Sequence, residues 1–467
     1  MENFQSSKAG ASRNHEKNPV LVRWDQVAST KWAEPAVLSA EGEVVRTFAA
    51  IEEEARRWTD TFSEFPGHQG VSLQIGNCAE WPAILLAVWR SGRALLPMEC
   101  DIPCGRREET EELCGAGLRL MVKEAELKLF ALNHSPWPAG PRTDFLKLTS
   151  GTTAEPRAIR FTAAQLLADC DNICDTMGLR EDDRNYGTIS FAHSYGFSNL
   201  ITPLLCRGIP LIAAVDLMPR ALIDGLGCSG ATVFPGVPAL FRALGELRGA
   251  GNALRLCISA GAPLTKEVAR RFLENWGLKI HSFYGASECG GICYDLDEAP
   301  DIPPGYVGPP LKNVAVRMEG EGPSQVQVRS QAVGTGYHPD QGDENLRDGM
   351  FRPSDLLEWN RDGYAISGRI SDFINVGGRK VNPSEVERVL RLSPRVRDVV
   401  VLGMPGSARG QEIAACVAGE ATEDELRKLC FRNLPSWQVP RRWFFWEEIP
   451  LNARGKVSRA DLRARLE

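Results

Sequence analysis

Strand-like and helix-like hydrophobic patterns alternate through most of the chain. Residues 36–48 alternate in polarity around a Gly turn and predict a β-hairpin, with Thr47 as the cap of the helix that follows. Residues 71–75 and 95–97 predict strands on either side of an apolar helix over 81–90. Strands that alternate with helices predict a layered α/β fold with a mainly parallel sheet.

The same alternation continues through the middle of the chain. Residues 145–148 and 158–161 predict two strands around a polar loop, and a helix is expected over 163–177. Two later strands end in turns at 259–264 and 284–288. Open α/β sheets bind ligands where their strands end, so these turns are candidates for a binding site.

The last third of the chain differs in character. Beyond Gly305, short alternating strands such as 314–318, separated by Gly and Pro turns, predict a β subdomain, and near Gly368 the chain returns to charged helices and short strands. The patterns therefore predict an α/β protein with two domains. The large, multi-subdomain N-terminal domain takes residues 1–370, and the small α+β C-terminal domain takes 371–467.

Composition and charge narrow the class of protein. Of the 467 residues, 43% are hydrophobic and 24% are charged, which is ordinary for a globular protein with a large core. The formal net charge of −6 gives no electrostatic reason to expect nucleic acid or an anionic membrane as the partner. Residues 1–18 lack the apolar core of a signal peptide, and no apolar run approaches the roughly 20 residues that span a bilayer. We therefore expect a cytoplasmic protein.

The cysteines give no sign of a disulfide framework or a metal centre. Thirteen are scattered along the chain, without a CxxC pair or Cys/His ligand spacing. We expect reduced thiols, most of which fill the core.

A hydroxyl-rich loop is the first candidate for chemistry. It carries Thr149, Ser150, Gly151, Thr152 and Thr153, followed by Arg157. Small hydroxylated residues and Gly let backbone and side-chain donors converge on an anion, and the arginine adds the charge that a polyphosphate attracts. The spacing does not match GxxxxGK[ST], and a solvated surface loop is the alternative.

Further motifs follow this loop in a fixed order. They are Tyr284-Gly285-Ala286-Ser287-Glu288, Arg352-Pro353-Ser354-Asp355, Gly368-Arg369-Ile370-Ser371-Asp372 with Gly377-Gly378-Arg379-Lys380, and Arg454-Gly455-Lys456-Val457-Ser458-Arg459. With the loop, they resemble the signature motifs of AMP-forming acyl-adenylate enzymes. That superfamily includes acyl- and aryl-CoA synthetases, adenylation domains of peptide synthetases, and beetle luciferases.

The resemblance implies a reaction in two halves. A carboxylate attacks the α-phosphorus of ATP, with Mg²⁺ on the triphosphate, and gives acyl-AMP and pyrophosphate. A thiol, usually that of coenzyme A or of a carrier protein, then displaces AMP. Between the halves the C-terminal domain is expected to rotate on a hinge at Ser371, where the family usually has Asp or Lys.

The resemblance also assigns the ATP site. The loop 149–153 would hold the β- and γ-phosphates, with Arg157 where the family commonly has Lys. Glu288 would ligate Mg²⁺, and the hydroxyl of Ser287 would reach the α-phosphate.

The nucleoside contacts are implied in the same way. Asp355 would accept hydrogen bonds from the ribose hydroxyls, with Arg369 beside it. The remaining cofactor-binding candidates are Gly261, Ala262 and Pro263 along the adenine, and Tyr284, Gly285 and Ala286 of the motif that ends in Glu288.

The C-terminal motifs would serve both half-reactions. Lys456 would bridge the attacking carboxylate and the phosphate oxygens, although without the other motifs it reads as a solvated lysine in a basic tail. Gly377 and Gly378, followed by Lys380, would line the path of the pantetheine arm.

His193 falls in a segment that resembles the edge of the acyl pocket in acyl- and aryl-CoA synthetases, and a structural role for it is equally open. Amino-acid-activating members of the superfamily carry an Asp in this segment that pairs with the α-ammonium of the substrate. No Asp stands between Ser190 and Asn199, so the resemblance implies a carboxylic acid without that ammonium. The expected activity is that of an acid–CoA ligase. The alternatives are an enzyme that loads a carrier protein and a non-catalytic nucleotide-binding relative.

Overall fold

The structure is a computed structural model in which most of the chain is described. It describes residues 18–67, 70–133, 142–148, 157–214, 216–249, 253–300, 303–340, 342–376, 379–406, 411–451 and 457–466. Within these residues, no helix is both long and apolar enough to cross a bilayer.

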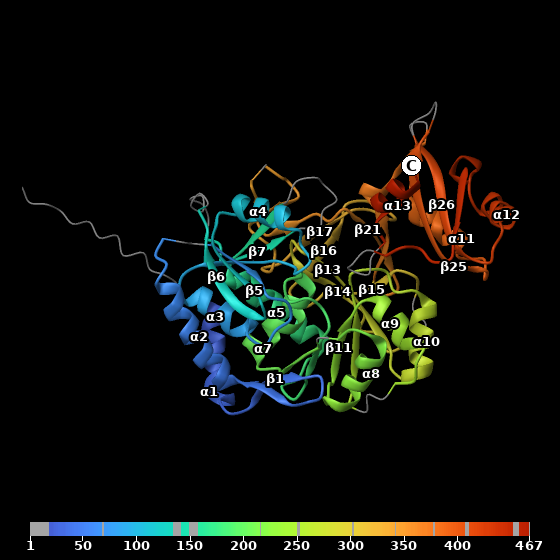
Figure 1. The fold of residues 1–467 in the computed structure, drawn as a ribbon. Coiled ribbons are helices and arrows are strands. Elements are labelled where there is room, and N and C mark those ends of the chain that lie inside the picture. The colour runs from blue at the N-terminus through green and yellow to red at the C-terminus, as the bar shows by residue number, and fades with distance from the viewer. Residues whose placement is uncertain are drawn as a thin grey trace, which may run out of the picture.

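An eight-stranded sheet forms one half of the N-terminal part (Figure 1). Its order is β14 (Gly290–Tyr294), β13 (Ile280–Ala286), β12 (Leu256–Ser259), β11 (Val233–Gly236), β9 (Asn185–Gly187), β10 (Leu211–Ala213), β1 (Pro35–Ser39) and β2 (Val44–Thr47). The strands from β13 to β1 pair in parallel, and the two edge strands are antiparallel. The predicted hairpin over 36–48 is the β1–β2 edge of this sheet.

A seven-stranded sheet forms the other half. Its order is β18 (Gly336–His338), β8 (Ala158–Phe161), β7 (Phe145–Leu148), β4 (Ala94–Pro97), β3 (Gly70–Gln74), β5 (Ala116–Lys123) and β6 (Glu126–Ala131). The central strands are parallel, whereas β7 and β8 form an antiparallel hairpin around the predicted phosphate loop.

Helices cover the sheets and share their cores. They are α1 (Pro19–Lys31), α2 (Phe48–Ser63), α3 (Trp81–Arg90), α4 (Cys104–Leu113), α5 (Ala163–Met177), α6 (Ser194–Gly196), α7 (Thr202–Arg207), α8 (Pro219–Cys228), α9 (Pro238–Gly245) and α10 (Lys266–Trp276). The largest core joins residues of α1, α2, α3 and α5 to strands of both sheets. A second core lies under α8, α9 and α10, which Figure 1 shows together beside the eight-stranded sheet.

Two small sheets follow the large ones and confirm the predicted β subdomain. One contains β15 (Tyr306–Gly308), β22 (Gly363–Arg369) and β21 (Asp355–Asn360). The other contains β16 (Ala315–Met318), β17 (Val326–Arg329), β20 (Met350–Phe351) and β19 (Leu346–Arg347).

The C-terminal part has cores of its own and lies at one end of the molecule (Figure 1). After a 3-10 turn (Ile370–Asp372) come β23 (Ile374–Val376), β24 (Arg379–Val381), α11 (Pro383–Leu390), β25 (Val396–Pro405), β26 (Gln411–Gly419), α12 (Glu423–Asn433), the turn Ser436–Gln438, β27 (Arg442–Trp446) and α13 (Arg459–Leu466). The predicted fold class, a large α/β N-terminal part with a smaller C-terminal one, is confirmed.

The helical segment after His193 is irregular. Residues Phe197–Ile201 form a π-turn between α6 and α7. All five residues of this turn are buried between the two sheets. Single π-turns inside helices often lie at functional sites, and this one begins four residues after His193.

Candidate active site

The turn between β13 and β14 presents Glu288. Close packing requires glycine at both ends of this hairpin. A Cβ on Gly285 would lie 2.6 Å from the carbonyl oxygen of Gly290. Gly290 has a φ of +71°, and a Cβ on it would lie 2.0 Å from Oδ1 of Asp169. The tight turn therefore fixes the direction in which Glu288 leaves the sheet.

Two contacts hold Glu288 itself. The hydroxyl of Tyr337 donates to its Oε1 at 3.0 Å, and its backbone carbonyl accepts from Gly334 N at 2.8 Å. Desolvation raises the pKa of Glu288 above its ordinary value. Its own backbone amide, the Tyr337 hydroxyl and the positive charge of Lys147 oppose this rise.

The donor set around Glu288 fits a magnesium ion that is shared with phosphate. No group of three or more His, Cys, Asp or Glu side chains comes together as a self-contained metal site in the described part of the chain. Mg²⁺ is commonly bound by one or two carboxylates together with substrate phosphates and water. A single desolvated carboxylate matches that pattern.

Arg157 joins this group through an aromatic ring. Its guanidinium carbon lies 4.1 Å from the centre of the Tyr337 ring, and its Nη2 lies 3.4 Å from Oδ2 of Asp343. Arg157 therefore stacks on the residue that holds Glu288. Sequence reasoning missed Tyr337, because it lies outside the quoted motifs and its hydroxyl shows no periodic signal.

Asp355 is the centre of a second polar group. It is buried, and its two carboxylate oxygens have separate donors. The hydroxyl of Tyr284 donates to Oδ2 at 2.8 Å, and Nε of Arg369 donates to Oδ1 at 2.5 Å. Asp355 and Arg369 are directly opposite in the β21–β22 register. Burial raises the pKa of Tyr284, so this phenol stays a hydrogen-bond donor.

Residues 261–263 lie near this second group because of strand order. They follow β12, which pairs in parallel with β13, so the loop and the Glu288 turn leave the sheet at the same edge. Gly261 has a φ of +87°, a conformation that favours glycine. Ala262 is half-buried and Pro263 is exposed.

A cavity of about 250 Å³ lies beside these groups. Its walls come from the end of β4 and the loop after it, from β7, from the start of α6 and from the Glu288 turn. They include Glu99, Lys147, His193, Ser194 and Ser287. Nδ1 of His193 accepts from Tyr195 N at 3.1 Å, which gives this histidine a capping role at α6.

Lys147 is a buried cation that sequence reasoning did not single out. Its ammonium nitrogen lies 4.5 Å from the centre of the Phe161 ring and 5.9 Å from that of Phe197. Desolvation lowers its pKa, while the negative charges of Asp169 and Glu288 oppose that change. A lysine that alternates with apolar residues along a strand normally indicates a face exposed to solvent. The sequence pattern therefore did not predict that Lys147 is buried.

Some predicted site residues fall outside the described residues. These are Thr149, Ser150, Gly151, Thr152, Thr153, Gly377, Gly378 and Lys456. Lys380 lies exposed on β24. The roles given to these residues stay predictions, whereas Tyr284, Ser287, Glu288, Asp355 and Arg369 do come together around one sheet edge.

Comparison with known proteins identifies the family. The family model of the AMP-binding enzymes matches residues 133–338, and the model of the AMP-binding enzyme C-terminal domain matches residues 385–456.

Three curated relatives are similar over about two thirds of the chain. A probable CoA ligase of Humulus lupulus is 28% identical over 67% of this chain and 64% of its own length. A putative acyl-CoA synthetase of Bacillus subtilis is 27% identical over 68% of this chain and 62% of its own length. A 2-succinylbenzoate–CoA ligase of Bacillus mycoides is 28% identical over 68% of this chain and 69% of its own length. The chain thus spans less than two thirds of the length of the first two of these relatives.

Solved structures show the same fold at low identity. An ATP-bound RpMatB-BxBclM chimera has a TM-score of 0.82 at 21% identity, covering 95% of this chain and 98% of that one. An anthranilate CoA ligase with anthranoyl-AMP has a TM-score of 0.80 at 19% identity, with 96% of each chain covered. With both family models matched in order, this chain belongs to the AMP-binding enzyme family.

Proposed function

We propose that this protein is an ATP-dependent, AMP-forming ligase that activates a carboxylic acid and transfers it to coenzyme A. The observation that carries the proposal is the meeting of two polar groups at one sheet edge. Tyr284, Asp355 and Arg369 form the nucleoside side, and Glu288 with Tyr337 forms the phosphate side. The similar proteins named as CoA ligases support the thiol acceptor.

The described residues divide the first half-reaction between them. Each oxygen of Asp355 has one donor and can accept another hydrogen bond, so the carboxylate fits the two hydroxyls of a ribose. Glu288 would hold Mg²⁺ against the triphosphate, and the ion would neutralise the charge of the leaving pyrophosphate. Ser287 belongs to the turn that presents Glu288, and it also lines the cavity. Its hydroxyl would therefore lie where the acid meets the α-phosphate.

The second half-reaction would use the C-terminal domain, which we place at residues 371–467. Rotation about Ser371 would carry Lys456 away after adenylation and bring Gly377 and Gly378 to the pantetheine arm. We place the enzyme in the cytoplasm, where ATP and coenzyme A are available.

The cavity favours a small acid. Its 250 Å³ lies below the roughly 300–1,000 Å³ of pockets for drug-sized ligands, and its walls mix polar side chains with Pro97, Ile102 and Ala192. A short or aromatic acid fits such a space better than a long fatty chain. The similar proteins include a 3-hydroxybenzoate–CoA ligase of an Aromatoleum strain.

A substrate panel tests the proposal. Pyrophosphate release from Mg-ATP is measured with aromatic, short aliphatic, long fatty and amino acids, each with and without coenzyme A. We expect release with an aromatic or short acid, and a thioester when coenzyme A is present. Pyrophosphate release without thioester formation would indicate a carrier protein, rather than coenzyme A, as the acceptor. No pyrophosphate release with any acid of the panel would contradict the proposed ligase activity.

A further inference from the structure

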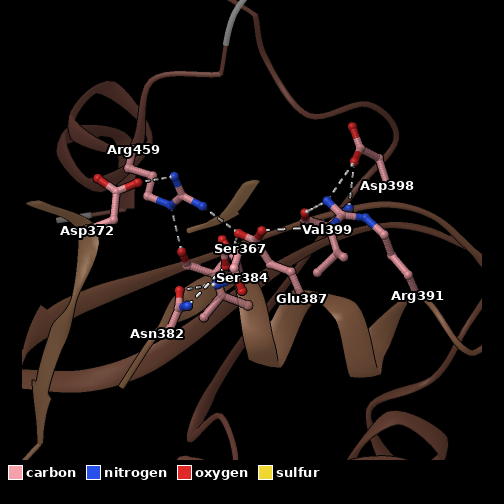
Figure 2. Close-up of polar contacts among 10 residues, drawn as sticks. Ser367, Asp372, Asn382, Ser384, Glu387, Arg391, Asp398, Val399 and Arg459 are labelled. Carbon is pink, nitrogen blue, oxygen red and sulfur yellow. Dashed lines mark hydrogen bonds and ion pairs between the residues drawn. The ribbon is translucent and has the colours of Figure 1, made fainter. Parts of the chain in front are cut away.

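Arg459 joins three elements of the C-terminal part through three hydrogen bonds. Its Nε donates to the carbonyl oxygen of Val401 on β25 at 2.9 Å, and its Nη1 donates to Oδ2 of Asp372 at 2.6 Å. Its Nη2 donates to Oε1 of Glu387 on α11 at 2.7 Å. Figure 2 shows the guanidinium between Asp372 and Glu387. All three nitrogens of the fork are therefore engaged.

The surface that Arg459 contacts is itself fixed. Glu387 is buried, and its Oε1 also accepts from Val401 N at 2.8 Å, so one residue of β25 is bonded through both its backbone groups. One turn further along the same face of α11, Nη2 of Arg391 donates to the carbonyl oxygen of Val399 at 2.9 Å, as Figure 2 also shows. The acceptors thus form a rigid receptor for the guanidinium.

The positions of the partners along the chain give this cluster its meaning. Asp372 directly follows Ser371, the proposed hinge, and Arg459 comes three residues after Lys456. Three residues of extended chain span at most about 11 Å. One side chain therefore connects the segment beside the hinge to the segment that carries the proposed catalytic lysine.

We propose that Arg459 is a positioning residue for Lys456, which it ties to the hinge segment so that both move as one body. This inference rests on the proposed function. A torsion change at Ser371 moves Asp372 directly, and the ion pair passes that movement to the start of α13. Without the pair, the start of α13 keeps the packing of Val457 and Leu462 on the C-terminal core but loses its direct tie to the hinge segment. The ammonium of Lys456 is then less well placed for the α-phosphate.

Arg459 is suited to this role by shape as well as charge. Its fork meets two carboxylates and a carbonyl in three directions at once. A lysine would keep the charge, but its single ammonium is a point donor on a flexible stem and does not reproduce that geometry. Arg459→Lys therefore separates positioning from charge.

The test compares the two half-reactions in the full-length protein. Because misplacement by about 1 Å can cost 100-fold, we expect Arg459→Ala to lower kcat for acid-dependent pyrophosphate release by about 10- to 100-fold. The KM for ATP and the capture of supplied acyl-AMP by coenzyme A should change much less. Arg459→Lys should recover part of the lost kcat.

Two further variants control the experiment. Arg465→Ala removes an exposed arginine from the same helix and should leave both half-reactions unchanged. Asp372→Ala should lower pyrophosphate release in the same way, and the double variant with Arg459→Ala should lose little more, because the two residues act as a unit.

Three results would overturn the inference. They are an unchanged pyrophosphate release, an equal loss in both half-reactions, and full additivity of the Asp372 and Arg459 losses. Urea unfolding of each variant identifies any that lose the C-terminal fold. If Arg459→Ala is one of them, pyrophosphate release in Arg459→Lys is compared with that of the wild type instead. Absence of pyrophosphate release from the wild-type protein would instead refute the proposed function itself.

Discussion

At the scale of single residues, the site depends on how polar groups are desolvated. Burial makes charge expensive, and the two carboxylates of the site, Asp355 and Glu288, have specific hydrogen-bond partners. Asp355 has a phenol and a guanidinium, and Glu288 has a phenol. For Glu288, desolvation outweighs the effect of that partner, and the pKa of the carboxyl is raised above its ordinary value.

This pKa predicts the acid limb of activity. The proposed role of Glu288 as a Mg²⁺ ligand requires the ionised carboxylate, so activity should fall as the pH drops through the raised pKa of Glu288. The Tyr337 hydroxyl lowers that pKa, and Tyr337→Phe should therefore move the limb to higher pH. We expect kcat at alkaline pH to fall by about 10- to 100-fold, the usual cost of losing an outer-shell partner. The measurement is a pH profile of pyrophosphate release.

Tyr364→Phe is the matched control for this profile. It removes a hydroxyl that donates to the carbonyl oxygen of Val316, away from Glu288. Its acid limb should match that of the wild type. An acid limb in Tyr337→Phe that stays in place or moves to lower pH would contradict the assignment.

At the scale of elements, the strength of local signals decided what the sequence could predict. The helix α5 begins and ends where its apolar spacing, its Thr162 cap and Gly178 indicate. The helix α1 was not predicted, although Asn18 as cap and Pro19 at the first position are start signals. The π-turn after His193 had no sequence signal, because it results from packing between two sheets.

The same limit applies to the site. Motif residues could be named in advance, but their partners could not, because Tyr337 and Arg157 are far apart in sequence and meet only when β18 pairs with β8. Lys147 was missed for a different reason. The local pattern placed it in a strand but did not show that both faces of that strand are covered.

The hairpin that presents Glu288 predicts a stability difference between two glycines. Gly290 and Gly277 share a φ of +71°, but a Cβ at Gly277 meets nothing within 4 Å, whereas one at Gly290 would overlap the Asp169 carboxylate. Gly277→Ala should lower the free energy of unfolding by about 1 kcal/mol, and Gly290→Ala by at least about 2 kcal/mol more. Urea unfolding measures both. Equal losses would contradict the steric role of Gly290.

At the scale of the whole molecule, the fold places two kinds of chemistry at one edge. Parallel strands β12 and β13 direct their following loops to the same side, and β21 and β22 bring Asp355 and Arg369 to them from a separate small sheet. The hydrophobic pattern predicted layered α/β structure followed by a β subdomain. It could not predict their relative orientation, which depends on packing in the shared core.

The central claim is that the acid is activated as an acyl-adenylate, and oxygen transfer tests it most directly. The acid substrate found in the panel is labelled in its carboxylate with a heavy isotope of oxygen and turned over with ATP and coenzyme A. Attack of the carboxylate on the α-phosphorus, followed by attack of the thiol on the carbonyl carbon, leaves one labelled oxygen in AMP. We expect AMP to carry that label, whereas label in inorganic phosphate, or unlabelled AMP, would contradict the account.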